Sequence, residues 1–232
     1  MHDIAANLAR IHERIAAAAQ QAGRNAGDIK LIAVSKTHSV EAIAAAVSAG
    51  QRAFGESTTQ EALQKIPLLA QSSAEWHFIG HLQSNKAKLI PGNFHWLHSL
   101  DDIKLAQRLA RLTQPERAPL NTLIEVNVTG DPAKHGIAPE KLFPLLDELL
   151  REQLNTIALR GLMTIAPHGV SVSEIRAVFA SLRRMRDDAM ARYTLPGFTE
   201  LSMGMSEDFE DAIREGATFI RVGTAIFGNR DY

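Results

Sequence analysis

Residues 31–37, LIAVSKT, form a short apolar run that ends in a polar triplet. Side chains alternate between the two faces of a β-strand, so Ile32, Val34 and Lys36 share one face. An apolar run of this length is typical of a strand buried in a sheet. The pattern predicts that Lys36 rises from an apolar face at the carboxyl end of that strand.

Strand-like and helical patterns alternate along the rest of the chain. The expected strands cover residues 30–35, 52–55, 75–80, 95–99, 121–128, 157–163, 199–203 and 218–223. The expected helices cover residues 40–49, 58–69, 103–112, 139–152, 173–193 and 207–215, after an opening helix marked by Ile4, Leu8, Ile11 and Ile15. Strands that alternate with helices indicate a parallel sheet, and eight such units predict a closed (β/α)8 barrel.

The rival architecture for such a chain is an open, doubly wound sheet. That sheet would need a Gly-rich fingerprint after an early strand to hold a dinucleotide, and the sequence has none. No repeat or linker divides the chain, and residues 131–136, DPAKHG, are typical of a solvated turn. We therefore expect one α/β domain over residues 1–232, a (β/α)8 TIM barrel with an extra N-terminal helix.

Composition excludes several classes of function. The 25 Lys and Arg residues nearly balance the 26 Asp and Glu residues, so we expect no nucleic-acid partner. The absence of cysteine excludes disulfides and Cys-ligated zinc, and His95 and His98 point to opposite faces of a strand, so we expect no metal site. No apolar stretch approaches bilayer length, and no leader-like segment opens the chain. We expect a cytoplasmic protein that does not associate with membranes.

Functional groups of a (β/α)8 barrel collect at the carboxyl ends of the strands, where Lys36 stands. Two interpretations of this lysine remain open. It either extends into solvent, as most lysines do, or presents a partly buried amine that forms a Schiff base with an aldehyde. One lysine does not decide between them.

The end of the chain contains a second set of candidate groups in residues 219–228, FIRVGTAIFG. Arg221 lies within an expected buried strand and needs a partner there, because a guanidinium does not lose its proton. Gly223 and Thr224 follow, where backbone amides and a hydroxyl can hold a phosphate. The preceding strand adds Ser202 to the same neighbourhood, although each of these short motifs alone is more typical of a turn or cap.

Taken together, these residues suit a ligand with an aldehyde at one edge and a phosphate at another. Pyridoxal 5′-phosphate (PLP) is such a molecule, and Arg221 would then face its pyridine nitrogen. A guanidinium cannot accept a proton and opposes protonation of that nitrogen. Such a site would bind the cofactor yet stabilise carbanions only modestly.

The chain resembles the pyridoxal phosphate homeostasis proteins, which have the barrel fold of the alanine racemase N-terminal domain. The resemblance covers essentially the whole chain and lies in residues 31–37 (LIAVSKT), 49–57 (AGQRAFGES), 75–86 (EWHFIGHLQSNK), 159–165 (LRGLMTI), 201–213 (LSMGMSEDFEDAI) and 221–228 (RVGTAIFG). It implies that Lys36 is the Schiff-base lysine, that Arg221 lies by the pyridine nitrogen and that Met163 lies near the ring. It also implies that the phosphate is held by Ser202, Gly223 and Thr224.

Two positions depart from the pattern of that family. Ser57 stands where the family commonly has asparagine, and His81 where it commonly has proline. Both residues follow expected strands and face the expected pocket. Ser57 can still make a hydrogen bond to the cofactor, with shorter reach than asparagine.

Racemisation requires two proton-carrying groups, one on each face of the α-carbon. In alanine racemase the second group is a tyrosine, but Tyr193 ends a long helix and Tyr232 is the last residue. His77 and His81 could substitute, yet we interpret them as a packed residue and a loop residue. We expect no catalytic residues and a PLP-binding protein that supplies or buffers the cofactor.

Several further expectations accompany this interpretation. We expect a monomer that passes PLP transiently to PLP-dependent apoenzymes. The alternative functions are a racemase-like PLP enzyme and an aldolase in which Lys36 attacks a sugar phosphate directly.

Overall fold

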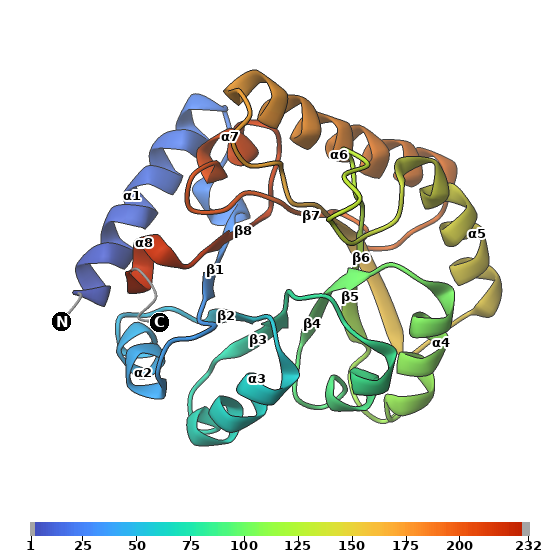
Figure 1. Ribbon diagram of the computed structural model, residues 1–232, viewed down its shortest axis with the longest axis horizontal. Helices are drawn as coiled ribbons and strands as arrows, with labels where there is room; N and C mark the ends of the chain where they lie inside the picture. The colour runs from blue at the N-terminus through green and yellow to red at the C-terminus, as the bar shows by residue number, and fades with distance from the viewer. Residues whose placement is uncertain (1–2, 229–232) are drawn as a thin grey trace.

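The computed structural model describes residues 3–228 and shows eight parallel strands that pair in chain order and close into a barrel. Figure 1 shows these strands as a central ring with the helices around it. The strands are β1 (Lys30–Val34), β2 (Ala53–Glu56), β3 (Glu75–Phe78), β4 (Trp96–Leu100), β5 (Leu120–Glu125), β6 (Ile157–Met163), β7 (Glu200–Ser202) and β8 (Phe219–Val222). The predicted (β/α)8 barrel is confirmed, and β8 closes it by pairing with β1.

Helices pack on the outside of the barrel; the first precedes β1, the last follows β8, and the others lie between consecutive strands. They are α1 (Ile4–Gln21), α2 (Val40–Ser48), α3 (Thr59–Lys65), α4 (Ile103–Leu112), α5 (Leu142–Glu152), α6 (Val172–Arg192), α7 (Phe209–Arg214) and α8 (Thr224–Phe227). Short 3-10 helices are η1 (Ala26–Asp28), η2 (Ile66–Leu69), η3 (Ser84–Leu89) and η4 (Pro139–Lys141). Across residues 3–228, no helix combines the length and apolarity needed to cross a bilayer.

Several expected helices are shorter in the structure than in the prediction: residues 139–152 begin as η4 before α5, and residues 207–215 contain α7 only from Phe209 to Arg214. Residues 58–69 show the physical reason most clearly. The pattern over residues 58–69 predicts one helix, but α3 ends at Lys65 and the chain continues as η2. Pro67 has no amide hydrogen to donate to the carbonyl group four residues earlier. The last turn therefore tightens into 3-10 geometry, which brings the chain round to β3.

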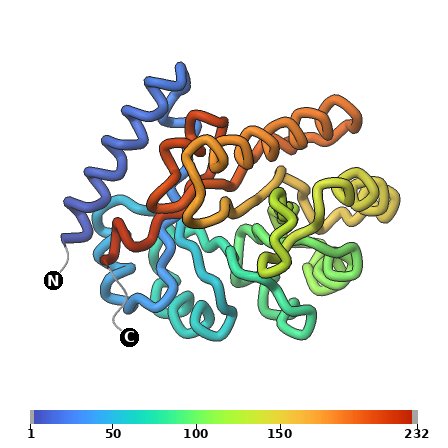
Figure 2. The backbone as a smooth tube through the Cα atoms, turned by 45° about the horizontal axis from the view of Figure 1, so that its top comes forward, coloured from blue at the N-terminus to red at the C-terminus, as the bar shows by residue number. Residues whose placement is uncertain are grey.

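The extra N-terminal helix packs on the outer side of the barrel next to α7 and α8, as Figures 1 and 2 show. Asp3 caps α1 by accepting a hydrogen bond from the amide of Ala6 at 3.0 Å. The apolar face of α1 is buried, and each large aliphatic side chain on it contributes about 2 kcal/mol. The side-chain amide of Asn7 donates to the carbonyl oxygen of Ile226 at 2.7 Å. The helix thus holds α8 in place after β8.

The barrel has two apolar regions. The larger one lies mainly between the strands and the helices, and it includes Leu31 and Ala33 of β1. The smaller one fills the barrel interior and consists of Ile32, Ala53, Leu123, Met163 and Phe219. The alternation predicted for residues 31–37 is therefore present, because Ile32 faces inward while its neighbours face the helices.

Candidate functional site

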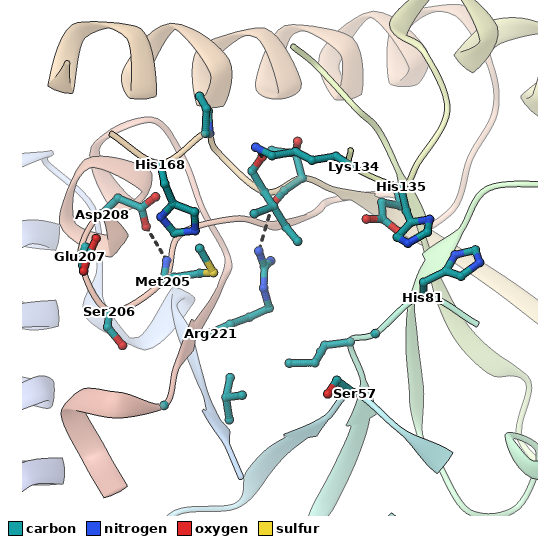
Figure 3. A pocket seen from close by; sticks show the side chains of 18 of the residues that line it. Ser57, His81, Lys134, His135, His168, Met205, Ser206, Glu207, Asp208 and Arg221 are labelled. Carbon is teal, nitrogen blue, oxygen red and sulfur yellow. Dashed lines mark hydrogen bonds between the residues drawn. The ribbon is translucent and has the colours of Figure 1, made fainter. Parts of the chain in front are cut away.

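A cavity of about 750 Å³ opens at the carboxyl ends of the strands. Five of the seven predicted site residues line it: Lys36, Ser57, Arg221, Gly223 and Thr224. Figure 3 shows Arg221 central among the labelled lining residues and Ser57 below it. The structure thus brings together residues that lie as far apart in the sequence as the first and last strands.

Lys36 lies two residues beyond β1 and is half-buried at the wall of the cavity, which Val34 also lines. The next residue, Thr37, has a φ of +67°, which a β-branched side chain rarely adopts. Glu61 of α3 supports this turn by accepting a hydrogen bond from the amide of Thr37. Strained backbone of this kind is concentrated at functional sites, where surrounding contacts hold it.

A buried ion pair anchors the strand on the side away from the cavity. Lys65 donates to Glu56 at 2.9 Å and to the carbonyl oxygen of Ser35 at 2.8 Å. The Ser35 hydroxyl donates to the same Glu56 oxygen at 2.7 Å. Burial raises the pKa of Glu56, and the bonds from Ser35 and Lys65 oppose that rise. These contacts fix the residue that precedes Lys36, and they were not predicted.

Arg221 lies almost fully buried at the floor of the cavity. It donates to the hydroxyl of Ser202 at 2.7 Å and to the carbonyl oxygen of Thr164 at 2.9 Å. Burial lowers the pKa of Arg221 to about 10, while the negative charges of Asp208 and Glu125 act to raise it. The guanidinium therefore remains protonated at neutral pH. The prediction that this arginine needs partners inside the barrel is confirmed.

Two predicted site residues do not line the cavity. Met163 belongs to the interior apolar cluster, and Ser202 is fully buried against Arg221 and His98. These two residues pair across β6 and β7, both at the ends of their strands. The loop after β7 instead brings Met205, Ser206, Glu207 and Asp208 to the cavity (Figure 3). Direct cofactor contacts of Met163 and Ser202 stay predictions.

Gly223 links β8 to α8 where the chain passes very close to β1. A Cβ atom at Gly223 would lie 3.1 Å from the carbonyl oxygen of Val34, so a side chain there would press on β1. The amides of Ile226 and Phe227 donate to the Gly223 carbonyl oxygen and close the first turn of α8. The amide groups of a first helical turn point away from the helix, and the Thr224 hydroxyl adds a donor beside them. The end of β1, which leads into Lys36, and the turn at Gly223 and Thr224 are thus next to each other.

Glu125 is a site residue that sequence reasoning missed. It ends β5, lines the cavity and is only 6% exposed. Its Oε2 atom has no hydrogen-bond partner among residues 3–228. Burial and the charge of Asp101 raise the pKa of Glu125 to about 7, and Arg221 opposes the rise. An acidic residue within the strand expected over residues 121–128 was the signal for this position.

Two histidines from different loops stack at one end of the cavity (Figure 3). The ring centroids of His81 and His135 are 3.8 Å apart, and the ring planes differ by 8°. Lys134 also lines the cavity and donates to the carbonyl oxygen of Ile165 at 3.1 Å. Burial lowers the pKa of Lys134. Residues 131–136 form a largely exposed turn, as expected, and Lys134 and His135 of this turn also line the cavity, which was not expected.

The chain matches the family described as "Alanine racemase, N-terminal domain" over residues 6–231. It is 47% identical over 232 residues to the pyridoxal phosphate homeostasis protein of Pseudomonas aeruginosa, covering all of this chain and 98% of that one. The chain belongs to the pyridoxal phosphate homeostasis protein family. The Escherichia coli K12 member of the family is 43% identical over 244 residues, covering all of this chain and 99% of that protein.

Solved structures agree with this family assignment. PipY of Synechococcus elongatus PCC7942, solved with PLP bound, is 38% identical with a TM-score of 0.85, and the match covers 97% of this chain and all of that one. Alanine racemase of Corynebacterium glutamicum is 18% identical with a TM-score of 0.66, over 96% of this chain and 61% of that one. The second likeness concerns the fold alone. The predicted family and fold are both confirmed.

Proposed function

We propose that the protein binds PLP in this cavity and takes part in PLP homeostasis, with the cofactor held as a Schiff base on Lys36. The observation that carries the proposal is the junction of β1 and β8. It puts the Lys36 amine and the turn at Gly223 and Thr224 on neighbouring strand ends, with the Arg221 cation at the floor. PLP carries an aldehyde, a pyridine ring and a phosphate, and this set of groups matches all three. When bound, PLP supplies a reactive aldehyde and an electron-accepting ring.

Each residue has a distinct proposed role. Thr224 and the amides after Gly223 hold the phosphate, and Arg221 presents a donor to the ring nitrogen and opposes its protonation. Ser57 lines the same cavity and offers one hydroxyl to the cofactor. With Arg221 beside the ring nitrogen, the site retains the cofactor, but the unprotonated ring withdraws electrons only weakly. That property suits a carrier more than a catalyst.

Among the candidates for a second proton-carrying group, Tyr193 and His77 do not line the cavity, whereas His81 does. The hydroxyl of Tyr193 donates to Asp147 at 2.7 Å in an exposed position outside the barrel. Tyr232 lies outside the described residues, and His77 is fully buried below the cavity. We propose a monomer that supplies PLP transiently to apoenzymes in the cytoplasm, rather than a racemase.

One observation favours the alternative of a racemase-like PLP enzyme. Glu125 lines the cavity with an unpartnered oxygen, and its pKa of about 7 is suited to accepting and returning a proton near neutral pH. Incubating the PLP-loaded protein with a panel of L-amino acids in deuterium oxide separates the two functions. The carrier proposal predicts α-proton exchange no faster than with free PLP. Exchange well above that rate, lost in Glu125→Gln, would establish the enzyme.

Cofactor binding itself is tested by loading the purified protein with PLP and removing free cofactor by gel filtration. We expect a visible Schiff-base band that stays with the wild-type protein and is lost in Lys36→Ala. Lys134→Ala is the matched control, because it removes the amine of another lysine that lines the cavity. A band that survives in Lys36→Ala and disappears in Lys134→Ala would refute the assignment of the lysine.

Delivery and oligomeric state require separate measurements. Mixing the PLP-loaded protein with a PLP-dependent apoenzyme should restore that enzyme's activity, and an excess of a PLP-scavenging protein distinguishes direct transfer from release into solution. Sedimentation at several concentrations tests the monomer. A stable dimer at all concentrations would contradict that part of the proposal.

A further inference from the structure

A continuous chain of hydrogen bonds runs through the barrel interior from its amino-terminal mouth to Arg221. We call Glu75, His77, His98, Ser202 and Arg221 the interior chain. Its contacts are Glu75 Oε1 to His77 Nε2 at 2.7 Å, His77 Nδ1 to His98 Nε2 at 2.9 Å, His98 Nδ1 to Ser202 Oγ at 2.9 Å, and Ser202 Oγ to Arg221 at 2.7 Å. The three middle residues are fully buried, and Lys30 contacts Glu75 at the amino-terminal end at 2.9 Å.

The direction of every bond in the interior chain follows from its two ends. Arg221 can only donate, so the Ser202 oxygen accepts from it and the Ser202 hydroxyl hydrogen is available for His98. His98 Nδ1 is then an acceptor, and its proton lies on Nε2. By the same step, His77 accepts at Nδ1 and donates from Nε2 to the Glu75 carboxylate, which only accepts when ionised. Both rings are neutral and carry their single proton on Nε2.

The charges around the interior chain favour this neutral form of both rings. Burial is the main cause that lowers the pKa of His77 and of His98. The neighbouring charges of His77, Arg221 and Lys30 lower the pKa of His98 further. The charges of Lys30 and His95 also lower the pKa of His77, whereas Glu75 raises it.

The two ends of the interior chain remain charged. Burial acts to raise the pKa of Glu75, but the bonds from His77 and Lys30 lower it to about 2, so the carboxylate stays ionised. At the other end, Asp208 and Glu125 face Arg221 and oppose the loss of its proton.

A second proton on either histidine would break the interior chain. Protonated His98 would direct an N–H at a Ser202 hydroxyl that already accepts from Arg221, and protonated His77 would direct an N–H at the N–H of His98. In both cases one buried donor loses its acceptor, which is costly inside a barrel. The hydroxyl hydrogen would then have to turn away from His98, and the positive charge on the ring would repel the Arg221 guanidinium that is bonded to the same Ser202 oxygen.

We propose that the interior chain is a positioning relay: Glu75, His77, His98 and Ser202 hold the Arg221 guanidinium in one orientation beneath the cofactor, and protonation of the histidine pair releases it. This inference rests on the proposed PLP site for its effect on the cofactor. Its structural part concerns residues of the protein alone. The amino-terminal mouth of the barrel, where Glu75 and Lys30 lie, is thereby connected to the cofactor site at the opposite end.

The first test measures the tautomers of both rings by 15N-detected NMR on histidine-labelled protein, with and without PLP. We expect His77 and His98 each to carry one proton, on Nε2, at neutral pH. Assignment uses His77→Gln and His98→Gln. A proton on Nδ1 of either ring, or a doubly protonated ring at neutral pH, would overturn the relay whether or not PLP binds.

The second test compares Ser202→Ala with Ser99→Ala. Both serines are fully buried, and Ser99 follows His98 on β4, but the Ser99 hydroxyl has no hydrogen-bond partner among residues 3–228. We expect Ser202→Ala to release PLP about tenfold faster and to shift its absorption band, since Arg221 loses one of its two side-chain bonds. Ser99→Ala should match the wild type, and Ser202→Thr should recover slow release.

The pH dependence of release completes the test. Release of PLP from the wild type should accelerate on acidification as the histidine pair gains a proton. The release rate of Ser202→Ala should depend less on pH, because this variant already lacks one hydrogen bond of the interior chain. Equal release from Ser202→Ala and Ser99→Ala, with PLP bound, would overturn the inference and leave the proposed function intact. A wild-type protein that does not bind PLP would overturn the proposed function and the cofactor part of this inference.

Discussion

Replacing Glu125 by glutamine removes an ionisable group from the cavity while keeping nearly the same shape. The wild-type side chain is almost fully buried, and its Oε2 atom has no partner among residues 3–228. Burial is the main reason why its pKa is raised to about 7. Glutamine has no charge to lose, so the comparison isolates the free-energy cost of ionising Glu125 in the folded protein.

The sign of the effect follows from proton uptake. The folded pKa lies above the ordinary value of 4.5, so between these two values the folded state binds more protons than the unfolded state. The stability of the wild type therefore falls as the pH rises through this window. A shift from 4.5 to about 7 is a difference of about 2.5, which corresponds to about 3 kcal/mol at 1.36 kcal/mol for each unit.

The assay is urea unfolding of cofactor-free protein, followed by circular dichroism, at about pH 5 and about pH 8. We expect Glu125→Gln to gain about 2.5 kcal/mol relative to the wild type between these two pH values, since most of the window lies between them. Glu13→Gln, on the exposed face of α1, should show no such change. A difference between Glu125→Gln and wild type that is the same at both pH values would refute the reasoning about burial.

The remaining predictions concern the phosphate turn, the anchor of β1 and the N-terminal helix. Thr224→Val should weaken PLP binding by about 1 to 2 kcal/mol, the contribution of one hydrogen bond to a charged group, and Thr224→Ser should bind PLP as the wild type does. Equal dissociation constants for Thr224→Val and the wild type would show that Thr224 does not bind the phosphate. Lys65→Ala should lower the free energy of unfolding by about 3 to 5 kcal/mol, because Glu56 stays buried without its ion-pair partner. The double variant Lys65→Ala, Glu56→Gln should recover part of this loss. An unchanged midpoint of urea unfolding in Lys65→Ala would contradict the stabilising role of this ion pair. Asn7→Ala should cost about 1 kcal/mol and speed amide exchange in α8, because the bond to Ile226 is lost; exchange at the wild-type rate would argue against this support.

The barrel was predictable from the sequence because its evidence is local. Strands and helices alternate along the chain, and most strands lie in short segments rich in apolar residues that can be recognised without knowledge of their partners. Lys36 and Arg221 were recognisable for the same reason, as charged residues within or directly after apolar strands. The boundary of α3 was less certain, because Pro67 ends the α-helical hydrogen bonding but allows a 3-10 turn to continue.

The rest of the site depends on contacts between distant segments. Ser202 was grouped with the phosphate residues, but the structure turns its hydroxyl to Arg221 and His98 inside the barrel. The direction in which the Ser202 side chain points depends on the residue at which β7 ends, and the periodic pattern of the sequence does not determine where that strand ends. Glu125 and Lys134 line the cavity because the loop after β5 folds back over the strand end. The close packing of Gly136 permits this, since a Cβ atom there would lie 2.9 Å from Glu125 Cγ.

The most direct test of the account is to reduce the PLP-loaded protein with borohydride and to map the modified lysine by peptide mass spectrometry. The account predicts one phosphopyridoxyl group per chain, on the peptide that contains Lys36. It also predicts that Thr224→Val lowers the occupancy without moving the label. A label on Lys134 or any other lysine, with Lys36 unmodified, would contradict the claim that the cofactor is held where β1 meets β8.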